Sequence, residues 1–176
     1  GQKEGLNVVG VIPVGLFGQP AALDRIATFS QNNGLWMLDD AAQSFGASLS
    51  ENVVGTFGSA TATSFFPAKP LGCYGDGGAL FTNDDQLAAI ARSARVHGQG
   101  ADKYENERLG MTARLDTMQA AVLLAKLGIF DEELTLRQKA AARYADKLAG
   151  CGVIIPELSA TATSSWAQYV IRLPKG

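Results

Sequence analysis

One lysine stands in an apolar stretch that is rich in turn residues. The stretch SFFPAKPLGCYGDGG, residues 64–78, contains Lys69, the only lysine between Lys3 and Lys103. Lysine is rarely buried without a partner, so Lys69 is either a turn residue with its ammonium group in water or a functional amine. A partly desolvated amine loses its proton more readily, and a neutral amine can attack a carbonyl carbon to form a Schiff base. The local sequence leaves both interpretations open.

Two adjacent carboxylates, Asp39 and Asp40, follow a short apolar run and precede the residues AAQSFGA. A buried carboxylate needs a cation or several hydrogen-bond donors. Asp40 could face the protonated ring nitrogen of a cofactor such as pyridoxal phosphate, whose enzymes combine a lysine Schiff base with Asp or Arg at that nitrogen. Alternatively, one of the two aspartates caps the following turn, as aspartate often does. Gln43 could reach the same ligand or only the loop backbone.

Three cations lie in or near predicted loops. His97, the single histidine, lies at the end of a predicted helix, where a cation at the helix end is a more common role than catalysis. Arg108 and Arg114 are on the loop side of the next helix, and such arginines are either solvated or bind anionic substrates. None of these three predicts a reaction by itself.

The elements that must position these residues follow from hydrophobic patterning. An apolar run at residues 7–14, a helical pattern at 20–34 and a second apolar run at 35–40 predict a right-handed βαβ unit with parallel strands. Asp39 and Asp40 then lie at a carboxyl end, where such sheets bind ligands. Further strands are predicted at residues 59–67, 77–83, 153–156 and 167–174, and helices at 84–98, 115–130 and 131–150. Asn83 or Asp84 is the expected cap of the first of these helices.

Composition narrows the class of protein. The chain has 176 residues, 47% of them hydrophobic and 18% charged, with a net charge of −2, which is typical of a globular protein and argues against nucleic-acid or anionic-membrane binding. No apolar run has the length of a transmembrane helix. Cys73 and Cys151 have no metal-site spacing, so we expect free thiols in a cytoplasmic protein. A nucleotide-binding α/β domain is disfavoured because GLFGQP, after the first strand, lacks the glycine fingerprint.

Five motifs occur in a characteristic order: DDAAQ, SFFPAK, GDGGA, RVHGQ and GMTARLDTMQAA. From about residue 9 to its end the chain resembles the pyridoxal-phosphate-dependent sugar aminotransferases of the DegT/DnrJ/EryC1/StrS family, most of all the members that aminate UDP-linked 3-keto sugars. The resemblance implies an α/β fold: a type I aminotransferase-like large domain with a mainly parallel sheet, and the start of a small C-terminal α+β domain. Residues 1–130 would be part of the large cofactor-binding domain, and residues 131–176 the connecting helix and the start of the small domain.

The resemblance also assigns residues. It makes Lys69 the Schiff-base lysine, Asp40 the partner of the pyridinium nitrogen, Gln43 a neighbour of the ring's phenolic oxygen and Ser64 a phosphate ligand. Lysine at position 69 favours amino transfer, since family members that dehydrate sugars carry histidine there. Thr112 stands where many members have an asparagine that reaches the cofactor phosphate of the other subunit. Arg114 matches an arginine near the sugar carboxylate in uronate-specific members.

The expected protein is therefore an aminotransferase that transfers an amino group, from glutamate, to a nucleotide-linked keto sugar for polysaccharide or cell-surface glycan synthesis. The family's sites are built from two subunits, which implies a homodimer. Family chains are about twice as long, so we expect the sequence to be a central piece of a longer protein, and this piece by itself need not be active. The alternative is a non-catalytic regulator, or a cofactor- or nucleotide-sugar-binding module with the same fold.

Overall fold

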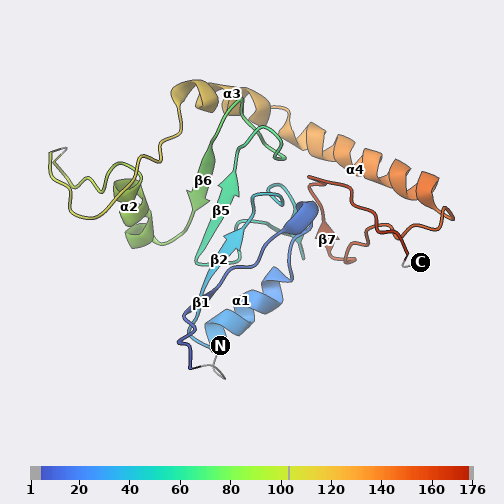
Figure 1. The fold of residues 1–176 in the computed structure, drawn as a ribbon, viewed down its shortest axis with the longest axis horizontal. Helices are drawn as coiled ribbons and strands as arrows, with labels where there is room; N and C mark the ends of the chain where they lie inside the picture. The colour runs from blue at the N-terminus through green and yellow to red at the C-terminus, as the bar shows by residue number, and fades with distance from the viewer. Residues whose placement is uncertain (1–4, 103, 175–176) are drawn as a thin grey trace.

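A mixed sheet forms the centre of the protein. The computed structural model describes residues 5–102 and 104–174. The three strands nearest the N-terminus in this sheet are parallel, and the fourth is antiparallel to its neighbour (Figure 1). The α/β class with a mainly parallel sheet is thus confirmed. In spatial order, the strands are β1 (Gly10–Val11), β2 (Trp36–Asp40), β5 (Ala60–Ser64) and β6 (Gly78–Phe81).

The predicted βαβ unit is present, with a shorter first strand than expected. Helix α1 (Leu23–Asn32) connects β1 to β2 and buries Leu23 completely against Met37 of β2. The strand predicted at residues 7–14 is regular only over Gly10–Val11, and Pro13, which has no N–H to donate to a ladder, separates it from the bridge at Val14. The chain returns to β2 at an isolated parallel bridge between Val14 and Asp40. A 3₁₀ turn, η2 (Leu16–Gly18), follows.

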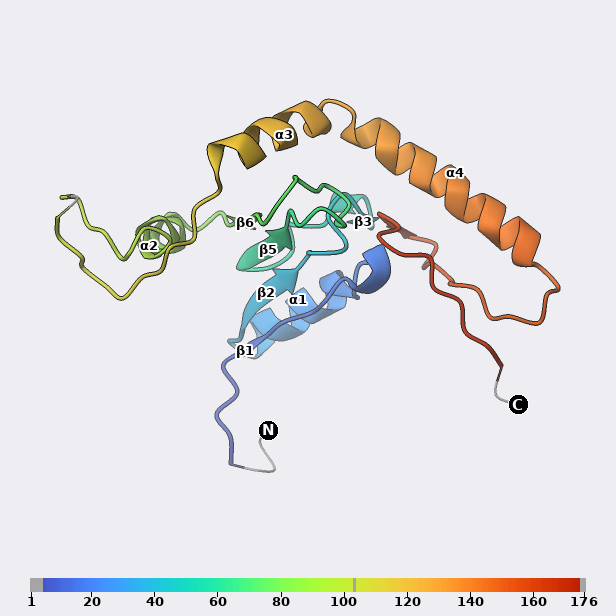
Figure 2. The same cartoon turned by 45° about the horizontal axis from the view of Figure 1, so that its top comes forward.

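Three further helices follow β6. Helix α2 (Asp85–Ala94) begins at the N-cap Asp84, whose Oδ1 accepts hydrogen bonds from the N–H groups of Gln86 and Leu87. Of the two caps expected from the sequence, Asp84 is therefore the one that the structure shows. Helices α3 (Thr117–Leu127) and α4 (Phe130–Leu148) form an arch over one side of the sheet (Figure 2). Leu123 of α3 and Phe130 of α4 are buried with Phe65 and Leu71 in one apolar cluster.

A second, small sheet was not predicted from the sequence. It has the order β4-β3-β7, with a hairpin of β3 (Ser48–Leu49) and β4 (Asn52–Val53) and the distant β7 (Ala162–Thr163). The strands predicted at residues 153–156 and 167–174 were wrong. One isolated bridge, Ile154 to Arg172, joins these segments, because the backbone near residues 165–168 bonds instead to the turn at η2. The division at residues 130 and 131 stays a prediction.

The two faces of the main sheet differ. Met37, Asp39, Thr61 and Ala79 point to one face, since strand register places paired residues on the same side. Helices α1, α3 and α4 pack on this face.

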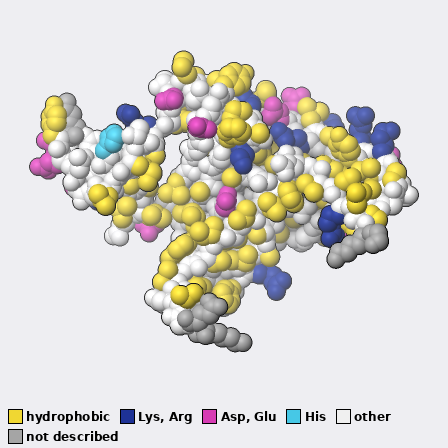
Figure 3. All heavy atoms as spheres, viewed as in Figure 1, with side chains coloured by type: hydrophobic (Ala, Val, Ile, Leu, Met, Phe, Trp, Pro, Cys, Tyr) yellow, Lys and Arg dark blue, Asp and Glu magenta, His cyan; other side chains and the backbone are white. Residues whose placement is uncertain are grey.

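The other face of the main sheet is open. It carries Trp36, Asp40, Ser64 and Leu80, and Trp36 and Leu80 are 46% and 43% exposed. Apolar side chains are visible on the surface over β1 and its surroundings (Figure 3). Among the residues described, no helix has the length and apolarity needed to span a bilayer.

Candidate functional site

Asp40 and Ser64 lie on the same face and at the same edge of the sheet. Asp40 is the last residue of β2 and is paired with Ala62 of the parallel strand β5, and Ser64 is the last residue of β5. Parallel strands end at a common edge, and residues two apart share a face. Asp40 Oδ1 accepts a hydrogen bond of 3.0 Å from the N–H of Ala42, so this aspartate does cap the following turn. No described residue donates to its other carboxylate oxygen, so a ligand can still bind there.

The loop after β5 holds Lys69 in a fixed position. The N–H of Lys69 donates to Phe66 O at 2.8 Å and closes a tight turn, after which Pro70, Leu71 and Cys73 are buried. A Cβ atom at Gly72 would lie 2.7 Å from two carbonyl oxygens, so only glycine fits without movement. Helix α3 fastens the loop, with Lys126 Nζ donating to Gly72 O at 2.8 Å.

The side chain of Lys69 is half-buried at this edge. Among the described residues, none forms a hydrogen bond or an ion pair with its amine. The backbone of Lys69 is thus fixed in the loop that follows β5, and its amine has no partner among the described residues. This position agrees with the functional interpretation of Lys69, although a solvated turn lysine would also lack a partner.

Gln43 is oriented by two hydrogen bonds. Its side-chain oxygen Oε1 accepts from the N–H of Phe17 at 2.9 Å, and its backbone oxygen accepts from the hydroxyl of Ser165 at 2.6 Å. The amide nitrogen Nε2 has no partner among the residues that the structure describes, so Gln43 presents a donor. Sequence reasoning identified Gln43 and missed both of its supports. One is a backbone group, and the other is 122 residues away.

Asp39 points to the opposite face and is not exposed at all. No N–H or O–H of the described residues satisfies either carboxylate oxygen. Burial, together with the nearby carboxylate of Asp40, raises the pKa of Asp39 from 3.8 to about 6, and the N–H of Gly55, outside hydrogen-bond geometry, offsets only part of the rise. The neighbouring aspartates therefore have different environments, and only Asp40 faces the edge with Ser64.

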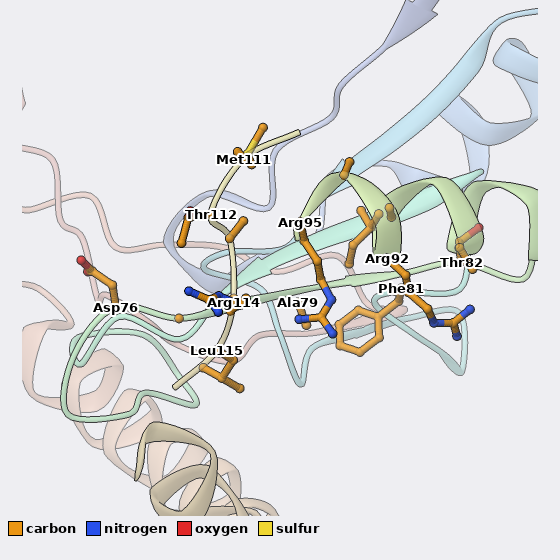
Figure 4. A pocket seen from close by; sticks show the side chains of 18 of the residues that line it. Asp76, Ala79, Phe81, Thr82, Arg92, Arg95, Met111, Thr112, Arg114 and Leu115 are labelled. Atoms are coloured by element: carbon orange, nitrogen blue, oxygen red, sulfur yellow. The ribbon is translucent and has the colours of Figure 1, made fainter. Parts of the chain in front are cut away.

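Thr112 and Arg114 lie elsewhere. Both line an open cavity of about 1190 Å³ along the free edge of β6, together with Arg92 and Arg95 of the α2 region (Figure 4). In this view Arg95 extends toward Ala79 and Phe81 of β6, whereas Arg114 extends toward the side of Asp76. Asp40, Gln43, Ser64 and Lys69 do not line it. The predicted site residues therefore form two groups, one at the sheet edge and one in this arginine-lined cavity.

The remaining loop cations have local contacts. His97 follows α2 with a φ of 60°, and its Nε2 lies 3.5 Å from Thr112 Oγ1. Arg108 makes a 3.4 Å ion pair with Glu107, its sequence neighbour. Neither contact adds a group to the sheet edge around Lys69.

The sheet-edge residues include three chemical groups that suit a pyridine aldehyde cofactor. The carboxylate of Asp40 would be the anion for a ring nitrogen, Nε2 of Gln43 would be the donor for a ring oxygen, and Lys69 would be the amine for the aldehyde carbon. The residues present thus fit pyridoxal phosphate.

Comparison with known proteins identifies the family. The family model described as the DegT/DnrJ/EryC1/StrS aminotransferase family matches residues 7–176, and the chain belongs to this family. Members of the family are pyridoxal-phosphate-dependent aminotransferases that act on nucleotide sugars. The resemblance seen in the motifs is confirmed.

Several relatives are similar over nearly the whole chain. A UDP-2-acetamido-2-deoxy-3-oxo-D-glucuronate aminotransferase of Pseudomonas aeruginosa is 48% identical, and a pleiotropic regulatory protein of Geobacillus stearothermophilus is 43% identical; the matches cover 93% and 94% of this chain. The crystal structure of a DegT DnrJ EryC1 StrS aminotransferase from Brucella abortus superposes with a TM-score of 0.94 at 49% identity, over 98% of this chain and 46% of the other. The chain spans about 45% of the length of the two curated relatives.

Proposed function

We propose that the protein carrying this sequence transfers an amino group, from glutamate, to the keto group of a nucleotide-linked sugar, using pyridoxal 5′-phosphate held at the carboxyl edge of β2 and β5. The observation that carries the proposal is the shared face and edge of Asp40 and Ser64, with Lys69 and Gln43 in the loops that follow these strands. Membership of an aminotransferase family supports the reaction type.

Each residue at the edge has a role that follows from its chemistry. Lys69 would hold the cofactor as a Schiff base and, when released, carry the proton between the substrate carbon and the cofactor. The charge of Asp40 would keep the ring nitrogen protonated, and Nε2 of Gln43 would donate to the ring oxygen. Ser64 Oγ accepts from the N–H of Phe66 at 3.2 Å and keeps its own proton for a phosphate oxygen. The bound cofactor supplies an electron sink for the carbanion formed during amino transfer.

We further propose that the protein is a homodimer in which Thr112 and Arg114 serve the site of the second copy. Two features support this arrangement. These residues line a cavity separate from the Lys69 edge, and the sheet exposes apolar residues such as Trp36 and Leu80, as a protein interface does. Arg114 would then bind an anionic group of the sugar, which favours a uronate substrate.

A regulatory role is the second candidate, and it is favoured by the 43% identical relative that is named a pleiotropic regulatory protein. In that case the site would bind cofactor or nucleotide sugar without turnover. Formation of an amino sugar from a UDP-linked 3-keto sugar and glutamate by the purified protein would exclude this candidate. A panel that contrasts 3-keto with 4-keto sugars, and uronates with neutral sugars, would define the substrate.

The first experiment traps the cofactor on its lysine. The protein is purified with added pyridoxal phosphate, its visible spectrum is recorded, and the linkage is reduced with borohydride and located by mass spectrometry. We expect the label on Lys69, loss of the visible band in Lys69→Ala, and an unchanged band in Lys139→Ala, which removes an exposed lysine of α4. A band that survives in Lys69→Ala would show that the assignment is wrong.

Mixed dimers test the second copy's role. Lys69→Ala and Arg114→Ala should each be nearly inactive, and mixing the two variants should restore activity, because one site of each mixed dimer then has both residues intact. Activity that stays absent after mixing, with subunit exchange demonstrated, would place Arg114 and Lys69 in the same subunit's site.

A further inference from the structure

A turn near the end of the chain packs against the cofactor edge. We name residues 164–168 the C-terminal turn. Ser164 and Ser165 within it are 1% and 0% exposed. The N–H of Ser165 donates to Gly18 O at 3.0 Å, and the N–H of Gln168 donates to Phe17 O at 3.2 Å. The C-terminal turn is therefore fastened to η2, which precedes the βαβ helix.

Gln43 lies between these two segments and is bonded to both. The hydroxyl of Ser165 donates to the backbone oxygen of Gln43, and the N–H of Phe17 donates to its side-chain oxygen. Both oxygens of Gln43 are thus acceptors in fixed bonds. The donor Nε2 is the part of the side chain that no described residue engages, so the two bonds determine which end of the amide a ligand meets.

The backbone here is strained, which indicates that tertiary contacts hold it. Phe17 and Trp166 have φ angles of 61° and 47°, in the left-handed region that bulky residues rarely adopt. Trp166 is held from α4, because its indole N–H donates to Gln138 Oε1 at 2.7 Å and its carbonyl oxygen accepts from Arg137 at 3.1 Å. A Cβ atom at Gly18 would lie 2.6 Å from the backbone nitrogen of Trp166, so the two segments are in direct contact.

From this geometry we propose that Ser165 is a positioning residue for the cofactor: through the C-terminal turn, braced by α4, it holds Gln43 so that its amide N–H points at the ring oxygen. The inference rests on the proposed cofactor site. It adds that the C-terminal turn, which holds none of the residues proposed above to contact the cofactor, controls how the cofactor titrates.

The physical consequence concerns charge on the ring oxygen. A donor to that oxygen withdraws negative charge, which otherwise stabilises the protonated form of the lysine linkage. Loss of a well-placed donor therefore moves the pH midpoint of the visible band upward. The free energy that corresponds to a shift of one pH unit is similar to that of one hydrogen bond to a charged group. A misplaced Gln43 should therefore shift the pH midpoint of the visible band by about 0.5 to 1 pH unit.

The test is Ser165→Ala, with Ser159→Ala as the matched control because Ser159 is exposed and its hydroxyl bonds only to nearby Thr161. We expect Ser165→Ala to raise the midpoint by about 0.5 to 1 pH unit and to weaken cofactor binding about threefold to tenfold, and Ser159→Ala to change neither. Gln138→Ala, which removes the brace from α4, is the second variant if Ser165→Ala does not fold, and it should shift the midpoint in the same direction.

A double-variant cycle separates positioning from general stability. If Ser165 acts through Gln43, Ser165→Ala should produce no additional midpoint shift in a Gln43→Ala background. Equal shifts in both backgrounds, or an unchanged midpoint in folded Ser165→Ala, would overturn the inference. Absence of any visible band in the unmodified protein would instead contradict the proposed function, so the two failures are distinguishable.

Discussion

The buried carboxylate of Asp39 makes a prediction that can be tested without a substrate. Asp39 is fully buried in β2, and no described group donates to either of its oxygens. The substitution Asp39→Asn keeps the shape of the side chain and removes its charge. We expect this substitution to change how the free energy of unfolding varies with pH. We expect a smaller effect on the free energy of unfolding at acid pH.

The sign and size follow from the raised pKa. Because the pKa of Asp39 is about 6 in the folded chain and 3.8 ordinarily, the folded state binds the proton more tightly than the unfolded state. Below about pH 3.8 the carboxyl is neutral in both states and costs nothing. Between that pH and about 6 the penalty of ionisation grows, and above about 6 it is complete, at most about 3 kcal/mol. The stability contributed by neutral Asp39 is therefore lost as the pH rises.

Urea unfolding at pH 4, 5, 6 and 7, at constant ionic strength, measures the effect. The free energy of unfolding of Asp39→Asn minus that of the unmodified chain should rise by up to about 3 kcal/mol from pH 4 to pH 7. Asp24→Asn is the control, since it removes an exposed carboxylate from the first turn of α1 and leaves Asp39 in place. A difference that is the same at pH 4 and pH 7 would refute the reasoning, because it would show that Asp39 ionises without penalty.

Three further substitutions test the packing that positions the site. Gly72→Ala should lower the free energy of unfolding by about 1–3 kcal/mol and reduce borohydride labelling of Lys69, because the added Cβ meets two carbonyl oxygens; unchanged labelling would show that the loop adapts. Phe130→Ala should lower the free energy of unfolding by about 3–5 kcal/mol, as measured by urea unfolding. Phe29→Ala, at a 58% exposed position, should lower it much less, and similar losses in the two variants would contradict the assigned core. Asp84→Ala should cost about 1 kcal/mol by the same assay, through two lost hydrogen bonds at the start of α2, and no loss would show that the cap is dispensable.

Much of the main sheet could be predicted because its signals are local. The apolar run before Asp39 and Asp40, and the helical spacing that precedes it, predict strand and helix without knowledge of neighbouring segments. The cap at Asp84 is local as well, since the carboxylate bonds to the N–H groups two and three residues later. The predicted first strand was too long, and at its carboxyl end the reason is Pro13, which lies in an apolar run but cannot donate to a ladder.

The small sheet and the C-terminal strands were not predictable in the same way. Segments β3 and β7 are two residues each, and their pairing joins parts of the chain that are more than 100 residues apart. The apolar runs at residues 153–156 and 167–174 look like strands, but they share only one isolated bridge, between Ile154 and Arg172, and the N–H of Gln168 bonds to Phe17 of η2 rather than to a ladder. Strand propensity cannot distinguish a paired strand from a loop at these positions, because pairing depends on which other segments lie beside the residues.

For the site, the sequence alone determined the reactive types and their order: a lysine in a tight turn after one strand, and a pair of aspartates at the end of another. Only the tertiary structure decided that Asp40 faces the edge with Ser64 while Asp39 is buried against the core, because the register between β2 and β5 and the packing of Met37 on α1 fix which face each residue takes. It also brought Ser165 to Gln43. A hydrogen bond between residues 122 positions apart depends on the path of the whole chain, which no local pattern encodes.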